Sequence, residues 1–326
     1  MRKDVFVTGI TGQDGTFLTS QLLKENKYNI IGTTRNKNNS SFYKRLEYLN
    51  VDNLSLSNLT IIETNILDYE SINSIIKSSK IEFVYNLVGP GSVSKSVKDP
   101  FSSSESIIFA FNNLVKSLID NKIFPKFFQT SSSEMFERSE NEKLNESSLL
   151  SPKSPYGASK LYIHNLISFL RSRYEWDLTS GILFNHESEF RPNEYLLMKI
   201  INKAIEINKD RSNTLELGSL ELVRDWGFAG DHTRAMKMIL ENTPGENYVI
   251  GTGRGTSIKK LTDITFSYFN LNYKDYVSIN EKLLRNNEPM KIISDPKKIN
   301  KDTGWEPSVD IEELITRCIE YKVNNP

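Results

Sequence analysis

Cysteine and histidine are scarce in this chain of 326 residues, and their scarcity excludes several kinds of site. The one cysteine, Cys318, cannot form an internal disulfide, and a chain without disulfides is typical of a reducing compartment. The three histidines, His164, His186 and His232, are spread along the sequence. Because zinc sites draw on clustered cysteines and histidines, we expect no metal site.

The chain also lacks an excess of either charge and any long apolar run. Its 41 Lys and Arg residues balance 41 Asp and Glu residues, so no overall field favours nucleic acid or an anionic membrane. No apolar run approaches the roughly 18 residues that a membrane-spanning helix needs. A strand-like run at Val5–Val7 follows Met1 without a signal-peptide core. We therefore expect a cytoplasmic protein with no nucleic-acid or membrane partner.

What the first half does contain is an alternation of short β-branched runs with longer helical patterns. Strands are predicted at Val5–Thr8, Ile30–Thr34, Leu59–Glu63, Phe83–Leu87, Lys126–Thr130 and Thr179–Phe184. Helices are predicted at Phe17–Glu25, Tyr69–Ser78, Ile107–Asn121 and Tyr156–Tyr174. Repeated strand and helix units predict right-handed crossovers and a parallel sheet covered on both faces. The expected fold class is α/β, a doubly wound Rossmann sheet whose ligands bind at the C-terminal ends of the strands.

After Phe184 the alternation stops. Isolated helical patterns follow at Leu196–Ile207, Thr233–Glu241, Ser257–Phe269 and Ile311–Tyr321. We predict a Rossmann domain over residues 1–184, with return segments near 215–255. A smaller mixed α/β lobe for the substrate is expected mainly over 185–326.

A glycine-rich segment follows the first predicted strand and opens the first predicted helix. Its glycines permit a tight turn, close approach of the backbone to a diphosphate, and close packing of helix on sheet. The start of the helix adds free N–H donors and partial positive charge. The segment therefore predicts a dinucleotide site that includes Gly9, Thr11, Gly12, Gln13, Asp14 and Gly15.

The end of the second predicted strand indicates which dinucleotide is bound. An NAD enzyme usually carries an acid there for the ribose 2′-hydroxyl, whereas this chain has Arg35. A guanidinium suits a 2′-phosphate, so we predict NADP as the cofactor. After the third strand, Asn65 stands where an aspartate commonly binds the adenine amine, and its side-chain carbonyl can do the same. Ile66 and Leu87, at the ends of the third and fourth strands, complete this part of the predicted cofactor set.

Candidate catalytic residues occur in two segments. Tyr156 and Lys160 are four residues apart, on one face of a predicted helix. An ammonium group there, with the positive nicotinamide nearby, is expected to lower the tyrosine pKa towards neutrality, so that the tyrosine acts as a general base. Ser131–Glu134 lies at the C-terminal end of the fifth predicted strand. Its hydroxyls can orient a sugar, and its carboxylate can move a proton.

Five segments, in this order and spacing, resemble the GDP-mannose 4,6-dehydratases, which are extended short-chain dehydrogenases. They are GITGQDG at 9–15, SSSEMF at 131–136, SPYGASK at 154–160, GILFNHES at 181–188 and RDWG at 224–227. The resemblance implies that Ser132 hydrogen-bonds the C4 oxygen of the sugar and that Glu134 removes the C5 proton. Tyr156 with Lys160 then forms the couple that oxidises C4. Because Ser133 stands where dTDP-glucose enzymes carry an aspartate, Glu134 is expected to serve as both base and acid.

The same resemblance implies further contacts. It sets His186 beside the cofactor, and it implies a substrate set of Ser92, Ser133, Asn185, Arg191, Lys199, Arg224, Arg285 and Glu288. The segment Asn39–Arg45 resembles an arginine-bearing loop that meets a neighbouring subunit, which implies a homotetramer or a homodimer. The chain departs from the family pattern at Gly89–Ser92, Glu189–Pro192 and Asp231–His232, which surround the substrate rather than the hydride chemistry.

The sequence thus predicts an NADP-dependent nucleotide-sugar 4,6-dehydratase. This lyase would convert GDP-mannose or a similar GDP-sugar to the 4-keto-6-deoxy sugar by an internal redox cycle. One alternative is an epimerase or 4-keto reductase on the same scaffold, which would give Glu134 no role. Another is a non-catalytic sensor of NADP or nucleotide sugars, which the loss of Ser132, Tyr156 or Lys160 would have favoured.

Overall fold

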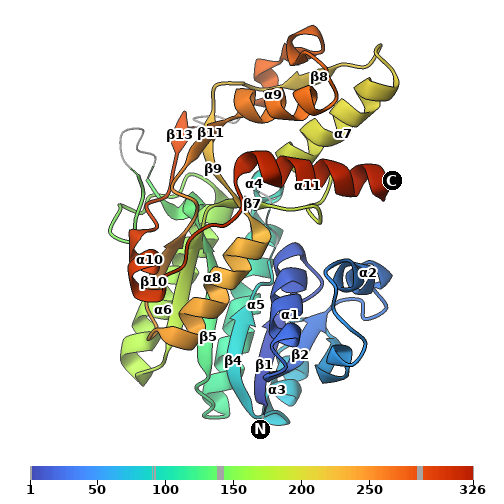
Figure 1. The fold of residues 1–326 in the computed structure, drawn as a ribbon. Coiled ribbons are helices and arrows are strands. Elements are labelled where there is room, and N and C mark those ends of the chain that lie inside the picture. The colour runs from blue at the N-terminus through green and yellow to red at the C-terminus, as the bar shows by residue number, and fades with distance from the viewer. Residues whose placement is uncertain (1, 90, 92, 138–142, 285–288, 326) are drawn as a thin grey trace.

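The structure, a computed structural model, describes residues 2–89, 91, 93–137, 143–284 and 289–325. Its centre is a seven-stranded parallel sheet in the order β3-β2-β1-β4-β5-β6-β10 (Figure 1). The strands are β1 (Lys3–Thr8), β2 (Tyr28–Thr34), β3 (Leu59–Glu63), β4 (Ile81–Asn86), β5 (Lys126–Ser132), β6 (Leu178–Leu183) and β10 (Asn247–Ile250). The order reverses between β1 and β4, as in a doubly wound sheet, so the predicted fold class is confirmed.

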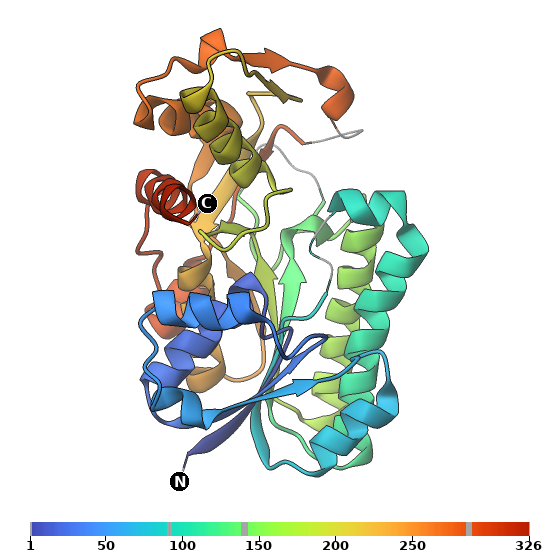
Figure 2. The same ribbon diagram turned by 90° about the vertical axis from the view of Figure 1, so that its right-hand side faces the viewer.

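Helices cover both faces of this sheet. One face carries α3 (Tyr69–Lys77), α5 (Pro100–Asp120) and α6 (Pro155–Tyr174), and the other carries α1 (Gln13–Lys24) and α8 (Ala229–Asn242) (Figure 2). An apolar core lies between the sheet and the helices on each face. In β1, Phe6 packs in the core under α3, α5 and α6, while Val5 and Val7 pack in the core under α1 and α8. Successive residues of a strand point to opposite faces, so the central strands are buried on both sides. None of the described helices is long and apolar enough to cross a membrane.

The second half of the chain builds smaller sheets beyond the C-terminal ends of the central strands (Figure 1). One contains β7 (Asn185–Glu187), β9 (Val223–Phe228), β11 (Gly255–Ser257) and β13 (Lys291–Ile292), and β8 (Leu215–Leu217) pairs with β12 (Val277–Ile279). The helices of this half are α7 (Leu196–Lys209), α9 (Ile258–Tyr268), α10 (Lys297–Thr303) and α11 (Ile311–Asn324). β10 returns to the central sheet beside β6. The division of the chain into two domains near residue 184 stays a prediction.

The strands and helices predicted from the sequence are present, with shifted ends. The sequence reasoning missed α2 (Ser40–Tyr48) and α4 (Val93–Lys98). The expectation of a loop at Asn39–Arg45 is wrong, because Asn39 accepts a hydrogen bond from the backbone N–H of Phe42 and so caps α2. Phe42 and Leu46 are one helical turn apart and are both buried, which holds this largely polar segment in a helix.

Candidate active site

The glycine-rich turn lies at the C-terminal end of β1, beside the point where the strand order reverses. Gly9 has a φ of +67°, and a Cβ there would lie 3.1 Å from the Cα of Val88. At Gly15 a Cβ would lie 2.3 Å from the carbonyl oxygen of Ile10. Gly12 precedes α1 and makes no side-chain cap, so the first N–H groups of the helix are left for a ligand. The turn therefore has the shape and the donors that a diphosphate needs.

The other predicted cofactor residues of the first strands follow the same edge of the sheet. Arg35 comes directly after β2, is exposed, and makes no side-chain hydrogen bond or ion pair within the described part of the chain. Asn65 follows β3, and its side-chain oxygen accepts a hydrogen bond from the N–H of Leu67 at 3.1 Å. Leu87 follows β4, and the carbonyl of Ile66 accepts a hydrogen bond from Asn113. Among the described residues nothing pairs with this guanidinium at the end of β2, so it is available to an anionic ligand.

Asp14 and His186 form an ion pair beside this turn. The imidazole Nε2 lies 3.1 Å from a carboxylate oxygen of Asp14, and Nδ1 donates to the carbonyl of Phe184 at 2.8 Å. Burial opposes the charge on both groups, but each holds the other ionised, so the pKa of Asp14 falls and that of His186 rises. The His186 ring also stacks on that of His232, with centroids 4.6 Å apart. Burial lowers the pKa of His232 to about 3, so the second ring is neutral.

The segment after β7 packs on the start of α1. The Ser188 hydroxyl donates to the side-chain oxygen of Gln13 at 2.8 Å, and the Phe190 ring stacks on Phe17 with centroids 5.1 Å apart. The guanidinium of Arg45 lies over Phe190 and also donates to a backbone carbonyl of the glycine-rich turn. The resemblance placed Arg45 in a loop that meets a neighbouring subunit. In the structure, Arg45 instead points toward the glycine-rich turn of its own chain.

Two segments meet at the end of β5. Ser132 ends the strand, and its hydroxyl accepts a hydrogen bond from the N–H of Glu134, at the start of the 3-10 turn η2 (Ser133–Met135). Ser154 caps α6 by accepting a hydrogen bond from the N–H of Gly157. A Cβ at Gly157 would lie 2.4 Å from the carbonyl oxygen of Glu134, so the glycine lets α6 begin against η2. This contact brings Tyr156, the residue before Gly157, close to Glu134.

Tyr156 and Lys160 occupy consecutive turns of α6. The Nζ of Lys160 lies 5.7 Å from the centre of the Tyr156 ring and donates to the carbonyl of Thr130 at 2.7 Å. Burial lowers the pKa of Lys160 to about 8. Burial also raises the pKa of Tyr156 to about 12, although a hydrogen bond with Ser132 acts in the opposite direction. In the chain alone, the cost of burying a phenolate outweighs the groups that stabilise it. The expected lowering of the tyrosine pKa includes the charge of the nicotinamide and stays a prediction.

Arg191 is the predicted substrate residue with the most defined surroundings. Its Nε lies 3.0 Å from the buried carboxylate of Glu187, and its guanidinium lies 3.6 Å from the centre of the Tyr195 ring. The charge of Arg191 also acts on Tyr156, so Arg191 lies near the predicted catalytic tyrosine. Sequence reasoning identified neither Glu187 nor Tyr195, because each lies four residues from Arg191 in a segment without regular periodicity.

The remaining predicted substrate residues are more dispersed. Ser133 opens η2, and Asn185 pairs with Trp226 between β7 and β9. Lys199 is exposed on α7, and its Nζ donates to the carbonyl of Glu216 in β8. Arg224 is nearly buried in β9 and donates to the carbonyl of Val223 at 2.8 Å. Ser92, Arg285 and Glu288 lie outside the described residues.

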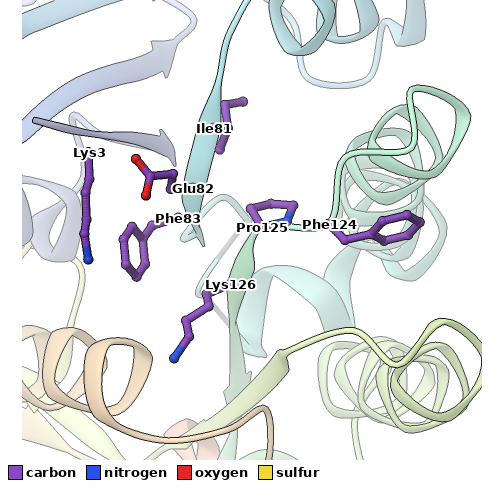
Figure 3. Close-up of a pocket in the computed structure, with 7 residues that line it drawn as sticks. All are labelled: Lys3, Ile81, Glu82, Phe83, Phe124, Pro125 and Lys126. Carbon is purple, nitrogen blue, oxygen red and sulfur yellow. The ribbon is translucent and has the colours of Figure 1, made fainter. Parts of the chain in front are cut away.

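A hollow lies at the opposite edge of the sheet from the glycine-rich turn (Figure 3). It measures about 450 Å³, is open to solvent, and is lined by Lys3, Ile81, Glu82, Phe83, Phe124, Pro125 and Lys126. Both of its lysines already have partners, because Lys3 lies over the Phe83 ring and Lys126 donates to the carbonyl of Thr243. It sits at the N-terminal ends of the strands, away from the glycine-rich turn, and holds none of the predicted site residues. The candidate site is therefore at the C-terminal edge.

Comparison with known proteins agrees with this geometry. The family model described as GDP-mannose 4,6 dehydratase matches residues 6–318. GDP-mannose 4,6 dehydratase 1 of Arabidopsis thaliana is 33% identical over 325 residues, which cover 98% of this chain and 89% of the relative. GDP-mannose 4,6 dehydratase of Cricetulus griseus is 29% identical over 350 residues, which cover 99% and 92%.

Solved structures with the same fold include both dehydratases and epimerases. DesIV, a dTDP-glucose 4,6-dehydratase from Streptomyces venezuelae, superposes with a TM-score of 0.84 at 20% identity and covers 99% of this chain and 97% of its own. A UDP-glucose 4-epimerase from Thermotoga maritima gives a TM-score of 0.82 at 24% identity, with 98% and 99% covered. At such identities the likeness establishes the fold alone.

Proposed function

Because the chain belongs to the GDP-mannose 4,6-dehydratase family, we propose that it is a nucleotide-sugar 4,6-dehydratase. This lyase removes water from GDP-mannose or a similar GDP-sugar and yields the 4-keto-6-deoxy sugar. The observation that supports the proposal is the contact between η2 and the start of α6, which brings Glu134 near enough to Tyr156 for its charge to act on the phenol. An epimerase or a 4-keto reductase needs the tyrosine couple but no C5 base.

We propose NADP as the cofactor. The glycine-rich turn supports a dinucleotide, because Gly9 has a left-handed φ and packs against the backbone of Val88, and the first N–H groups of α1 carry no side-chain cap. The exposed Arg35, which has no partner among the residues that the structure describes, suits a 2′-phosphate. When bound, the nicotinamide supplies a hydride acceptor and donor together with a positive charge near the phenol. That charge would oppose the effect of burial on the pKa of Tyr156, which the chain alone leaves at about 12.

The protein groups then act in sequence. Ser132 donates a hydrogen bond to the C4 oxygen, and Tyr156 takes the proton of the C4 hydroxyl while Lys160 stabilises its phenolate. The C4 ketone so formed acidifies the C5 hydrogen, which Glu134 removes. Glu134 returns a proton to the C6 hydroxyl, which leaves as water. No external reductant is consumed, because the hydride taken from C4 is returned to C6. C5 then takes up a proton from solvent, which balances the proton that Tyr156 took from the C4 hydroxyl and releases.

The nucleotide is held by the second half of the chain in this proposal. Asn185 and Arg224 are assigned to the diphosphate, and Arg191 is assigned to the reacting sugar. The rest of the proposed substrate set comprises Ser133 and Lys199, together with three residues outside the described part of the chain, Ser92, Arg285 and Glu288. Arg191 is fixed by the Glu187 carboxylate and the Tyr195 ring. A guanidinium held in one orientation binds phosphate or sugar oxygens at a lower entropic cost than a free side chain.

The experiment that tests the function is Glu134→Gln. The substitution keeps the size of the side chain but removes its basicity, so formation of the 4-keto-6-deoxy sugar is expected to fall about 10²-fold or more. Solvent deuterium should enter C5 of the product with the unmutated enzyme and be absent from sugar recovered with the variant. Tyr156→Phe, the comparison variant, should abolish the transient reduced-cofactor absorbance as well.

Two results would contradict the assignment. Undiminished product from Glu134→Gln would show that another group removes the C5 proton. Turnover of a nucleotide sugar by the unmutated enzyme without loss of water would favour the epimerase or reductase alternative.

We also propose that the protein is a homo-oligomer, a homotetramer or a homodimer, with a second copy seated on α5 and α6. These helices lie side by side on one face of the sheet (Figure 2) and carry exposed large apolar side chains, among them Phe101, Phe109, Tyr162 and Phe169. Such side chains on adjacent helices are typical of a surface that is covered in the assembly. A cytoplasmic location stays a prediction from the sequence.

A further inference from the structure

A row of buried polar side chains crosses the sheet beneath the catalytic group. Thr8, Asn86 and Gln129 are register partners in β1, β4 and β5, and each is at most 1% exposed. Two positions earlier on these strands are Phe6, Val84 and Phe127, which belong to the apolar core under α5 and α6. Residues two apart on a strand point to the same face, so the polar row faces the same helices. Polar side chains on strands that are otherwise apolar need a reason beyond packing.

Hydrogen bonds run along this row in one direction. The Thr8 hydroxyl accepts from the N–H groups of the two residues after Asn86 and donates to the side-chain oxygen of Asn86 at 2.6 Å. The Asn86 amide nitrogen donates to the side-chain oxygen of Gln129 at 2.7 Å, and the Gln129 amide nitrogen donates to the carbonyl of Thr130 at 2.8 Å. Each amide is therefore held in one orientation, because turning it over would set like groups against each other. Donors and acceptors joined in this way strengthen one another.

The row ends at the anchor of Lys160. The carbonyl oxygen that accepts from Gln129 also accepts from the Nζ of Lys160, at 2.7 Å, and Lys160 is 4% exposed. The other end of the row lies under the cofactor turn, where a Cβ at Gly9 would meet the backbone of Val88. A hydrogen-bonded line thus joins the glycine-rich turn to the group that holds the lysine.

We propose that Gln129 is a positioning residue for Lys160, because its amide, oriented by Asn86, fixes the Thr130 carbonyl that holds the ammonium group over the Tyr156 ring. This inference rests on the proposed function, in which Lys160 acts on the Tyr156 phenol. A lysine held by one flexible carbonyl would sample several positions. Two donors that converge on the same oxygen restrict that oxygen, and with it the ammonium group.

Gln129→Glu tests the proposal with a side chain of the same shape. A carboxylate still accepts from Asn86, but it has no N–H for the Thr130 carbonyl, and its charge lies beside Lys160. The ammonium group is drawn toward position 129, so it stabilises the Tyr156 phenolate less. The charged or titratable groups that otherwise act on Lys160 are Asp14 from α1 and Tyr156 on its own helix, and neither is altered.

Two quantities are measured: kcat as a function of pH, and the protonation of Lys160. The second is monitored through the ¹³Cε resonance of Lys160, which is assigned by its disappearance in Lys160→Met. For Gln129→Glu, the rising limb of kcat should move up by about one pH unit, which is about a tenfold loss of rate at a fixed pH below the limb. The Lys160 midpoint should rise above its value of about 8. Gln129→Met removes the same donor without adding a charge, so it should lower kcat and move the limb in the same direction by a smaller amount, while KM for the sugar stays within about twofold.

The outcomes separate this inference from the proposed function. If Lys160→Met retains full activity, the assignment of the lysine in the proposed function fails, whatever Gln129 does. If Lys160→Met is inactive while the pH profile and the Lys160 titration of Gln129→Glu superimpose on those of the unmutated enzyme, Gln129 does not position the lysine. If Gln129→Glu does not fold, Asn86→Asp replaces it, because it removes the donor to Gln129, and it should move the limb in the same direction by a smaller amount. An unmoved limb in that variant would also overturn the proposal.

Discussion

At the scale of single residues, Arg35 is the basis of the proposed preference for NADP. Because its guanidinium has no partner among the described residues, it can pair with a 2′-phosphate without breaking an existing contact. We predict that NADP(H) binds about tenfold tighter than NAD(H), or about 1.4 kcal/mol, and that Arg35→Ala shrinks this ratio. Calorimetric titration of both cofactors measures it, with Lys37→Ala as the control for a neighbouring exposed cation. Equal affinities in the unmutated protein would refute the NADP assignment.

His164 makes stability depend on pH. It is buried in α6, with Nδ1 2.8 Å from the Ser180 hydroxyl, and burial lowers its pKa from 6.5 to about 4. A lowered pKa means that the unfolded chain takes up the proton first, so the contribution of His164 is present above pH 6.5 and is lost as the pH falls through 4. This loss is on the order of 3 kcal/mol in the free energy of unfolding.

His164→Gln keeps a hydrogen-bonding group but does not titrate. Urea unfolding between pH 7 and pH 4 should therefore show a shallower loss of stability for the variant than for the unmutated protein. His186→Gln should have the opposite effect on the pH dependence of stability. The pKa of His186 is raised, so its contribution to the free energy of unfolding is lost as the pH rises. Parallel curves for His164→Gln and the unmutated protein would rule out this histidine as the cause.

At the scale of elements, two glycines of the glycine-rich turn are expected to have different roles: Gly15 allows close packing, and Gly12 allows the cofactor to bind. A Cβ at Gly15 would lie 2.3 Å from the Ile10 carbonyl oxygen, whereas a Cβ at Gly12 would lie 3.2 Å from the Gly9 carbonyl oxygen. We predict that Gly15→Ala lowers the free energy of unfolding by about 1–3 kcal/mol, because α1 must move away from the turn.

Gly12→Ala should change stability little and weaken cofactor binding more, because its methyl group would face the site where the diphosphate approaches the backbone. Thermal unfolding with and without the cofactor distinguishes the two variants. Equal losses of stability in both would mean that the two glycines do not divide packing and binding between them.

At the scale of the whole molecule, assembly depends on the outer face of α5 and α6. Phe101 is 85% exposed and Phe169 is 62% exposed. If a second copy covers them, Phe101→Lys and Phe169→Lys should each bury a charge and weaken self-association by at least about tenfold. Light scattering measures the effect, and Leu54→Lys, at an equally exposed position (82%) outside α5 and α6, is the control. A monomeric unmutated protein at micromolar concentration with cofactor present would contradict the proposed oligomer.

The sequence by itself determined the succession of strands and helices in the first half of the chain and the position of the glycine-rich turn. Both follow from local patterns, since strands buried on both faces read as short apolar runs and a tight phosphate-binding turn needs glycines at fixed spacing. The sequence also identified Tyr156 and Lys160 as a pair, because four residues make one helical turn. It missed α2, whose two buried residues, Phe42 and Leu46, are hidden in a polar segment.

Only the tertiary structure decided what surrounds the catalytic residues. Gly157 lets α6 begin against η2, Arg45 turns inward to the glycine-rich turn, and Gln129 meets Lys160 at one carbonyl oxygen. The pKa of Tyr156 also depends on burial, which the spacing of residues cannot report. Such contacts join residues far apart in the chain, and their energies depend on distance and solvent exclusion, which are set when the elements pack together.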